Sequence, residues 1–183
     1  MKGVRTLLIL LAAFLAVFLE VSATSVREAL GAQVDLLPGL MVYASLSCGL
    51  PTVTALAVLG GLWFDSLSSN PLGVSMLPLL VVGLAMHHYR KLIMRSQPLA
   101  QAVMGMLASA IVPLLQLLIL VNTDRPPGLS LISLWQWLVM VALGGLLTPL
   151  WFKLFDWLGQ AFGAKRVSPT TFRSDREIKR GRF

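Results

Sequence analysis

The sequence has little charge, one cysteine and two histidines. Charged residues are 13% of its 183 residues and hydrophobic residues 56%, whereas a soluble domain carries about 25% charged residues. This composition excludes an ordinary soluble domain and predicts an integral membrane protein. Cys48 alone excludes an internal disulfide. His87 and His88 precede Tyr89, Arg90 and Lys91, and no carboxylate or cysteine lies one turn away, so neither a metal site nor a cofactor is expected.

Catalytic motifs are also lacking. The sequence contains no Gly-x-Ser-x-Gly elbow, no His-Glu-x-x-His pair and no glycine-rich phosphate loop. An Asp-Arg-Pro sequence occurs in the loop 122–128, without the upstream lysine and downstream histidine that phosphatase chemistry needs. Acid–base catalysis is therefore not expected, and the protein is predicted not to be an enzyme.

The net charge of +7 is concentrated in the C-terminal tail. This distribution argues against nucleic-acid binding and indicates a topology signal. The tail can bind anionic lipid headgroups or a partner, or it can serve only orientation and solubility. Its basic residues are Lys165, Arg166, Arg173, Arg176, Lys179, Arg180 and Arg182.

Apolar runs predict an all-α, polytopic membrane protein with six transmembrane helices. They lie at approximately 5–23, 34–49, 52–65, 74–89, 99–121 and 129–155. Together they form one transmembrane domain, 1–162, and residues 163–183 form a basic cytoplasmic tail that is expected to be disordered. The first run is predicted to be an uncleaved helix; the alternative is a signal peptide with a cleavage site at Val21-Ser22-Ala23. The third run is short for a bilayer that needs about 20 residues per crossing.

Six crossings place both termini on one side of the membrane. On that side lie 13 of the 15 basic residues, and only Arg27 and Arg125 lie on the other. Because basic residues accumulate on the cytoplasmic side, both termini are predicted to be cytoplasmic. The loops around 24–34, 66–73 and 122–128 then face the exterior, or the periplasm in a bacterium.

The stretch 60–73 (GGLWFDSLSSNPLG) contains the strongest functional candidate, Asp65. A carboxylate at the membrane edge needs water, a hydrogen-bond donor or a partner chain. The following Ser, Asn, Pro and Gly residues predict a tight turn, either a plain interfacial turn or a functional one. Glu20 also lies toward the exterior face, and its approach to Asp65 would indicate a proton-coupling pair of a transporter. Ala57 and Gly61 share one helix face, as do Gly105 and Ser109, which favours close helix packing.

The order of these parts resembles the rod shape-determining protein MreD family. The resemblance is carried by Asp35-Leu36-Leu37-Pro38, by the turn Cys48-Gly49-Leu50-Pro51 and by the stretch from Gly61 to Gly73. The chain length, six spans and short basic tail fit as well. Trp63 and Phe64 depart from the family, which usually has aliphatic residues there, and the tail is longer.

The resemblance implies a non-enzymatic scaffold in the bacterial inner membrane. It would bind MreC and, through MreC or directly, the polymerase RodA, a class B penicillin-binding transpeptidase and MreB. A homo-oligomer is compatible with the sequence. The family is similar in fold to the substrate-binding S components of energy-coupling-factor transporters, so the alternative is a binding subunit of a vitamin transporter. The partner-binding outer face is predicted to be shaped by Gly61, Asp65, Asn70, Pro71 and Gly73.

Overall fold

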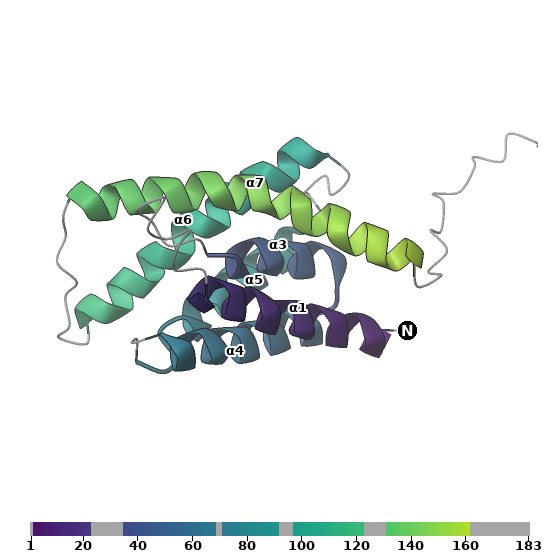
Figure 1. Cartoon of the computed structure of the whole chain (residues 1–183), viewed down its shortest axis with the longest axis horizontal. Helices are drawn as coiled ribbons and strands as arrows, with labels where there is room; N and C mark the ends of the chain where they lie inside the picture. Colours follow the sequence, from purple (N-terminus) through teal and green to yellow (C-terminus); the bar gives the residue numbers. More distant parts are fainter. Residues whose placement is uncertain (1, 23–34, 69–70, 92–96, 123–130, 162–183) are drawn as a thin grey trace, which may run out of the picture.

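A computed structural model describes residues 2–22, 35–68, 71–91, 97–122 and 131–161, and these residues are helical apart from short connections (Figure 1). The all-α prediction is confirmed for this part of the chain. Four of its helices are long and apolar enough to cross a membrane, whereas two are shorter. The helices are α1 (Lys2–Ser22), α3 (Leu37–Ser47), α4 (Leu50–Leu67), α5 (Met76–Tyr89), α6 (Pro98–Asn122) and α7 (Leu131–Ala161).

Helix α3 lies at the centre of the molecule. Residues 37–46 are all buried, and α3 packs against α1, α4, α5, α6 and α7. Because neighbours surround it, α3 is apolar on every side and shows no polar stripe. Its 11 residues span about 16 Å, well short of the roughly 30 Å of hydrocarbon in a bilayer. The surrounding helices shield this short element from lipid.

Several helix boundaries differ from the predicted ones. The run 34–49 begins as a helix only at Leu37, with Pro38 in the first turn, where a missing N–H costs nothing. Helix α4 starts two residues earlier and ends two residues later than predicted. With 18 residues, the helix is longer than the predicted span. Helix α7 continues past Pro149 to Ala161. The predicted tail 163–183, with its seven basic residues, lies outside the described residues.

Helices α6 and α7 approach closely through small residues. A Cβ atom on Gly105 would lie 2.5 Å from the carbonyl oxygen of Gly144 and would also collide with Thr148. A Cβ atom on Gly144 would collide with Ser109. The small-residue face predicted from Gly105 and Ser109 is therefore a helix–helix contact, of the kind that lets backbones pack tightly in membranes.

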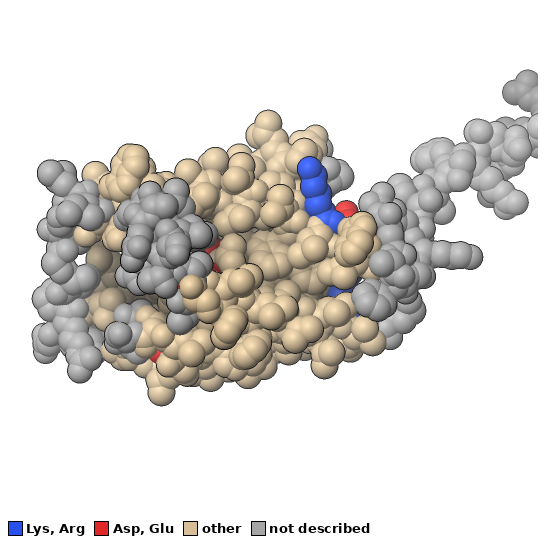
Figure 2. All heavy atoms as spheres, in the orientation of Figure 1, with Lys and Arg blue, Asp and Glu red and all other residues tan. Residues whose placement is uncertain are grey.

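Basic groups gather at the C-terminal end of α3. Arg5 donates a hydrogen bond to the Tyr43 hydroxyl (2.7 Å), and Arg90 donates to the carbonyl of Cys48 (3.1 Å). Cations are favourable at a helix C-terminus because unpaired carbonyls point there. On the face drawn in Figure 2, Lys and Arg atoms are visible only toward the end where α7 terminates, and most of the surface is neutral. The N-terminus lies at this same end in Figure 1.

Candidate functional site: the turn between α4 and α5

Asp65 lies in the last turn of α4 and is 2% exposed. Its Oδ2 accepts a hydrogen bond from the amide of Gly73 (2.7 Å), and the amide of Ser75 lies 3.2 Å from both carboxylate oxygens. Ser75 precedes the first residue of α5. A buried carboxylate at a helix N-terminus is stabilised by unpaired amides and by the helix dipole. Asp65 therefore joins the end of α4 to the start of α5.

The turn itself depends on Gly73. Helix α4 ends at Leu67, and Ser68 is extended. The amide of Val74 then donates to the carbonyl of Pro71 (3.3 Å), and Gly73 adopts a φ of +96°. Residues other than glycine rarely adopt this backbone conformation. Glycine at position 73 therefore allows the chain to turn back toward α5.

Gly61 allows α4 and α5 to approach each other closely beside this turn. A Cβ atom on Gly61 would lie 2.5 Å from Cα and 2.7 Å from the backbone nitrogen of Met76. Ala57, one turn earlier, is fully buried. The close-packing face predicted from Ala57 and Gly61 is thus the surface that receives the start of α5, directly beside the hydrogen bonds of Asp65.

A third helix joins this cluster through Ser75. The Ser75 side chain, 1% exposed, accepts a hydrogen bond from Nε2 of Gln116 in α6 (3.1 Å). The sequence pattern does not single out Ser75 or Gln116, because each lies inside an apolar run that predicts a span. A signal was present nonetheless, since an amide within an apolar segment needs a hydrogen-bond partner.

Four of the five predicted site residues meet at this turn. Gly61, Asp65, Pro71 and Gly73 belong to one structural unit, and Asn70 lies outside the described residues. Both carboxylate oxygens of Asp65 are engaged by backbone amides, so its charge fixes the turn. Among the described residues of the turn, Leu72 is the most exposed apolar side chain, at 69% exposure.

Glu20 does not pair with Asp65, in contrast to the proton-coupling arrangement considered from the sequence. Its Oε1 accepts a hydrogen bond from the amide of Leu36, just before the start of α3. Asp65 is held by Gly73 and Ser75. The carboxyl groups of Glu20 and Asp65 therefore belong to separate clusters.

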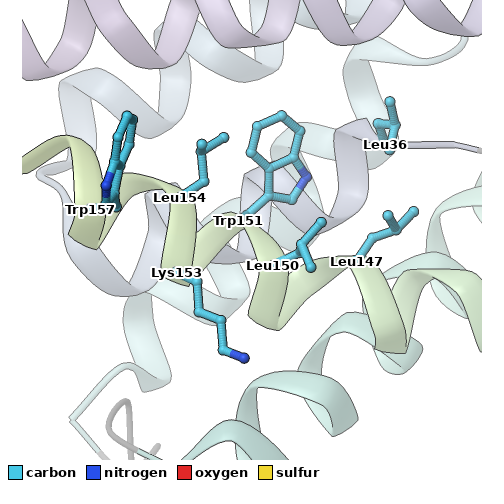
Figure 3. Close-up of a pocket in the computed structure, with 7 residues that line it drawn as sticks. All are labelled: Leu36, Leu147, Leu150, Trp151, Lys153, Leu154 and Trp157. Carbon is cyan, nitrogen blue, oxygen red and sulfur yellow. The ribbon is translucent and has the colours of Figure 1, made fainter.

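A cavity of about 520 Å³ lies along α7. Figure 3 shows Trp151, Leu154 and Trp157 on one side of the helix, whereas the Lys153 side chain points away from them. The remaining lining residues, Leu36, Leu147 and Leu150, are apolar. This cavity lacks the converging polar groups by which a small polar ligand is oriented.

Comparisons with known family models, curated protein sequences and solved structures found no match. Within the described parts of the chain, no group of three or more His, Cys, Asp or Glu side chains is arranged to hold a metal ion.

Proposed function

We propose that this protein is a non-enzymatic scaffold of the bacterial cell-wall elongation machinery, with the role implied by its resemblance to the MreD family. It crosses the inner membrane six times and keeps both termini in the cytoplasm. Its outer face binds MreC, and through MreC or directly it reaches RodA, a class B penicillin-binding transpeptidase and MreB.

The observation that carries this proposal is that the polar groups of the α4–α5 turn form hydrogen bonds within the protein itself. The Asp65 carboxylate binds two backbone amides of its own chain, and Ser75 links the turn to Gln116. These bonds hold the exposed Leu72 on a preorganised loop. A rigid apolar projection is suited to recognising another polypeptide, because little entropy is lost when it binds.

The proposed topology rests on the arrangement of the helix ends. The N-terminus and the end of α7 lie at one end of the molecule (Figure 1), where Arg5 and Arg90 also gather around α3. Basic residues favour the cytoplasmic side. The α4–α5 turn, at the far end of α4, then faces the periplasm. The basic tail adds attraction to anionic lipids, at about 1 kcal/mol per basic residue near the surface.

The alternative is a substrate-binding subunit of a small-molecule transporter, and the cavity along α7 is the observation that favours it. Its volume of about 520 Å³ falls within the range of ligand sites, although its lining is apolar. A thermal-shift screen of the purified protein against vitamins distinguishes the two functions. Saturable stabilisation by one compound would favour the transporter subunit.

The direct test of the scaffold is co-purification with MreC from native membranes. Leu72→Gln changes an exposed side chain at the turn, and Leu99→Gln is its control, because Leu99 is 75% exposed at the start of α6. We expect Leu72→Gln to reduce the MreC recovered and Leu99→Gln to leave it unchanged. Equal recovery with both variants would argue against the outer turn as the binding surface.

A further inference from the structure

The cavity along α7 follows the length of this helix and is open on its outer side. Its lining residues on α7 run from Leu147 to Trp157, a length of about 15 Å at the rise of an α-helix. Leu150, Leu154 and Trp157 are exposed. They belong to a segment, Ser133–Gly159, that is long and apolar enough to cross a membrane. When α7 spans a bilayer, the cavity therefore opens toward lipid.

The wall of the cavity is hydrocarbon along most of its length. Its aliphatic lining residues are Leu36, Leu147, Leu150 and Leu154. Trp151 contributes an indole ring (Figure 3), and because its Nε1 atom is buried, the carbon atoms of the ring form this part of the wall. A wall of this kind suits an unbranched alkyl chain, which needs no hydrogen-bond partner, better than it suits a polar small molecule.

The C-terminal half of the cavity carries a positive charge. Among the described residues that line it, Lys153 is the one charged residue. The Lys153 side chain is exposed and points away from Trp151 and Leu154 (Figure 3). Lysines near the ends of membrane helices keep their alkyl stem on apolar surface and extend the ammonium group to the headgroups. A negatively charged headgroup would complement Lys153.

A second cation lies at the same end of the molecule. The Arg5 guanidinium group lies over the ring of Tyr43, 5.7 Å from its centroid. Tyr43 in turn stacks on Phe155 of α7, with ring centroids 4.4 Å apart. Arg5 is thus connected to the part of α7 that carries Lys153 and Trp157. Tryptophan and basic residues together are typical of the boundary between hydrocarbon and headgroups, so a bound headgroup is expected at this end.

The length of the cavity matches one leaflet of a bilayer. The hydrocarbon core is about 30 Å thick, so one acyl chain extends through about 15 Å of it. The distance along α7 from Trp157, at the headgroup boundary, to Leu147 is also about 15 Å. An acyl chain whose headgroup lies beside Lys153 therefore ends near Leu147.

We propose that the cavity along α7 binds one acyl chain of an anionic phospholipid, with the headgroup beside Lys153. The lipid belongs to the leaflet on the side where α7 ends. This site requires only that α7 crosses the membrane, so it depends neither on the scaffold function nor on the number of crossings. It also differs from the site of a vitamin transporter, because the ligand enters from the bilayer and not from water.

Photocrosslinking tests the site. The purified full-length protein in detergent is mixed with phosphatidylglycerol that carries a diazirine at the end of one acyl chain, and crosslinked residues are mapped by mass spectrometry. We expect the crosslinks to concentrate near Leu147. Unlabelled phosphatidylglycerol should compete at a concentration about fivefold lower than phosphatidylcholine, which is the effect of one basic residue near an anionic headgroup. Crosslinks spread evenly over the exposed residues of α1, α6 and α7, or equal competition, would overturn the proposal.

A matched pair of variants tests the position of the acyl chain. Leu147→Trp places a large side chain in the cavity. Leu146→Trp is its control, because Leu146 is 69% exposed and is not among the residues that line the cavity. We expect crosslinking by the labelled lipid to fall in Leu147→Trp and to persist in Leu146→Trp. An equal yield in the two variants would place the chain elsewhere and contradict the site.

A second pair tests the headgroup without altering the apolar wall. Lys153→Gln should abolish the preference for phosphatidylglycerol over phosphatidylcholine, while the labelled chain still crosslinks near Leu147. Lys91→Gln is the control, because Lys91 is an exposed lysine two residues after the end of α5 and does not line the cavity. It should keep the fivefold preference. A preference that survives Lys153→Gln would contradict the assignment of the headgroup to Lys153.

Discussion

The carboxylate of Asp65 accepts a hydrogen bond from the backbone amide of Gly73, eight residues further along the chain and 2.7 Å away. This bond closes the turn between α4 and α5, and the amide of Ser75 adds a second contact. The Asp65 carboxylate thus holds the chain's own backbone, and Leu72 in the same turn remains exposed.

Replacement of Asp65 should destabilise the protein. Asp65→Ala leaves the buried amides of Gly73 and Ser75 without an acceptor, and hydrogen bonds to charged groups contribute about 1.5–3 kcal/mol each. We expect a loss of about 2–4 kcal/mol in the free energy of unfolding, measured by thermal or denaturant unfolding in detergent. The control is Ser66→Ala, because Ser66 is exposed and, among the described residues, its hydroxyl donates within its own helix to the carbonyl of Leu62 (2.6 Å). Equal stability of the two variants would contradict the role given to Asp65.

Two adjacent glycines of α4 should respond in opposite directions. Gly61→Ala places a methyl group 2.5 Å from the Cα atom of Met76, and overpacking of this kind costs about 1–3 kcal/mol. At Gly60 the methyl group would meet Leu37 at 3.4 Å, an ordinary contact, and alanine is the better helix former by up to about 1 kcal/mol. Gly60→Ala should therefore be neutral or stabilising. A melting temperature that falls as much for Gly60→Ala as for Gly61→Ala would show that the α4–α5 contact is looser than described.

At Gly73 there is room for a side chain, but the backbone conformation should disfavour any residue other than glycine. No atom lies within 4 Å of an added Cβ, but its φ is +96°, which costs a residue other than glycine about 1–3 kcal/mol. Gly73→Ala should lower stability by that amount, and Gly73→Asn by less, because asparagine tolerates positive φ better. Gly159→Ala is the matched control, because its Cβ is equally unobstructed and its φ is not positive. Unchanged stability of Gly73→Ala would mean that the turn can refold around alanine.

The sequence predicts the helical class and the general position of the helices well, because long apolar runs separated by turn formers leave few alternatives. It also predicts the close-packing faces at Gly61 and Gly105, since small residues one turn apart indicate tight contacts. Boundaries are less accurate. The pattern places Asp35 at the start of a span because it adjoins an apolar run, whereas α3 begins two residues after it, at Leu37.

The partners of the polar groups could not be predicted. Asp65 was expected to accept hydrogen bonds, but its donors are backbone amides, which every residue offers equally. The pairing of Ser75 with Gln116 joins positions 41 residues apart, and the sequence leaves open whether Glu20 approaches Asp65. Such contacts follow from how the helices cross, which local pattern does not specify.

The proposed function depends most on which side of the membrane each helix end faces, and accessibility labelling measures this directly. Three single-cysteine variants in a Cys48→Ser background, Leu72→Cys, Lys91→Cys and Phe183→Cys, are treated with a membrane-impermeant thiol reagent in spheroplasts. We predict that position 72 is labelled in intact spheroplasts, and that positions 91 and 183 are labelled only after permeabilisation. Labelling of positions 91 and 183 from opposite sides would contradict six crossings, and with them an outward-facing α4–α5 turn.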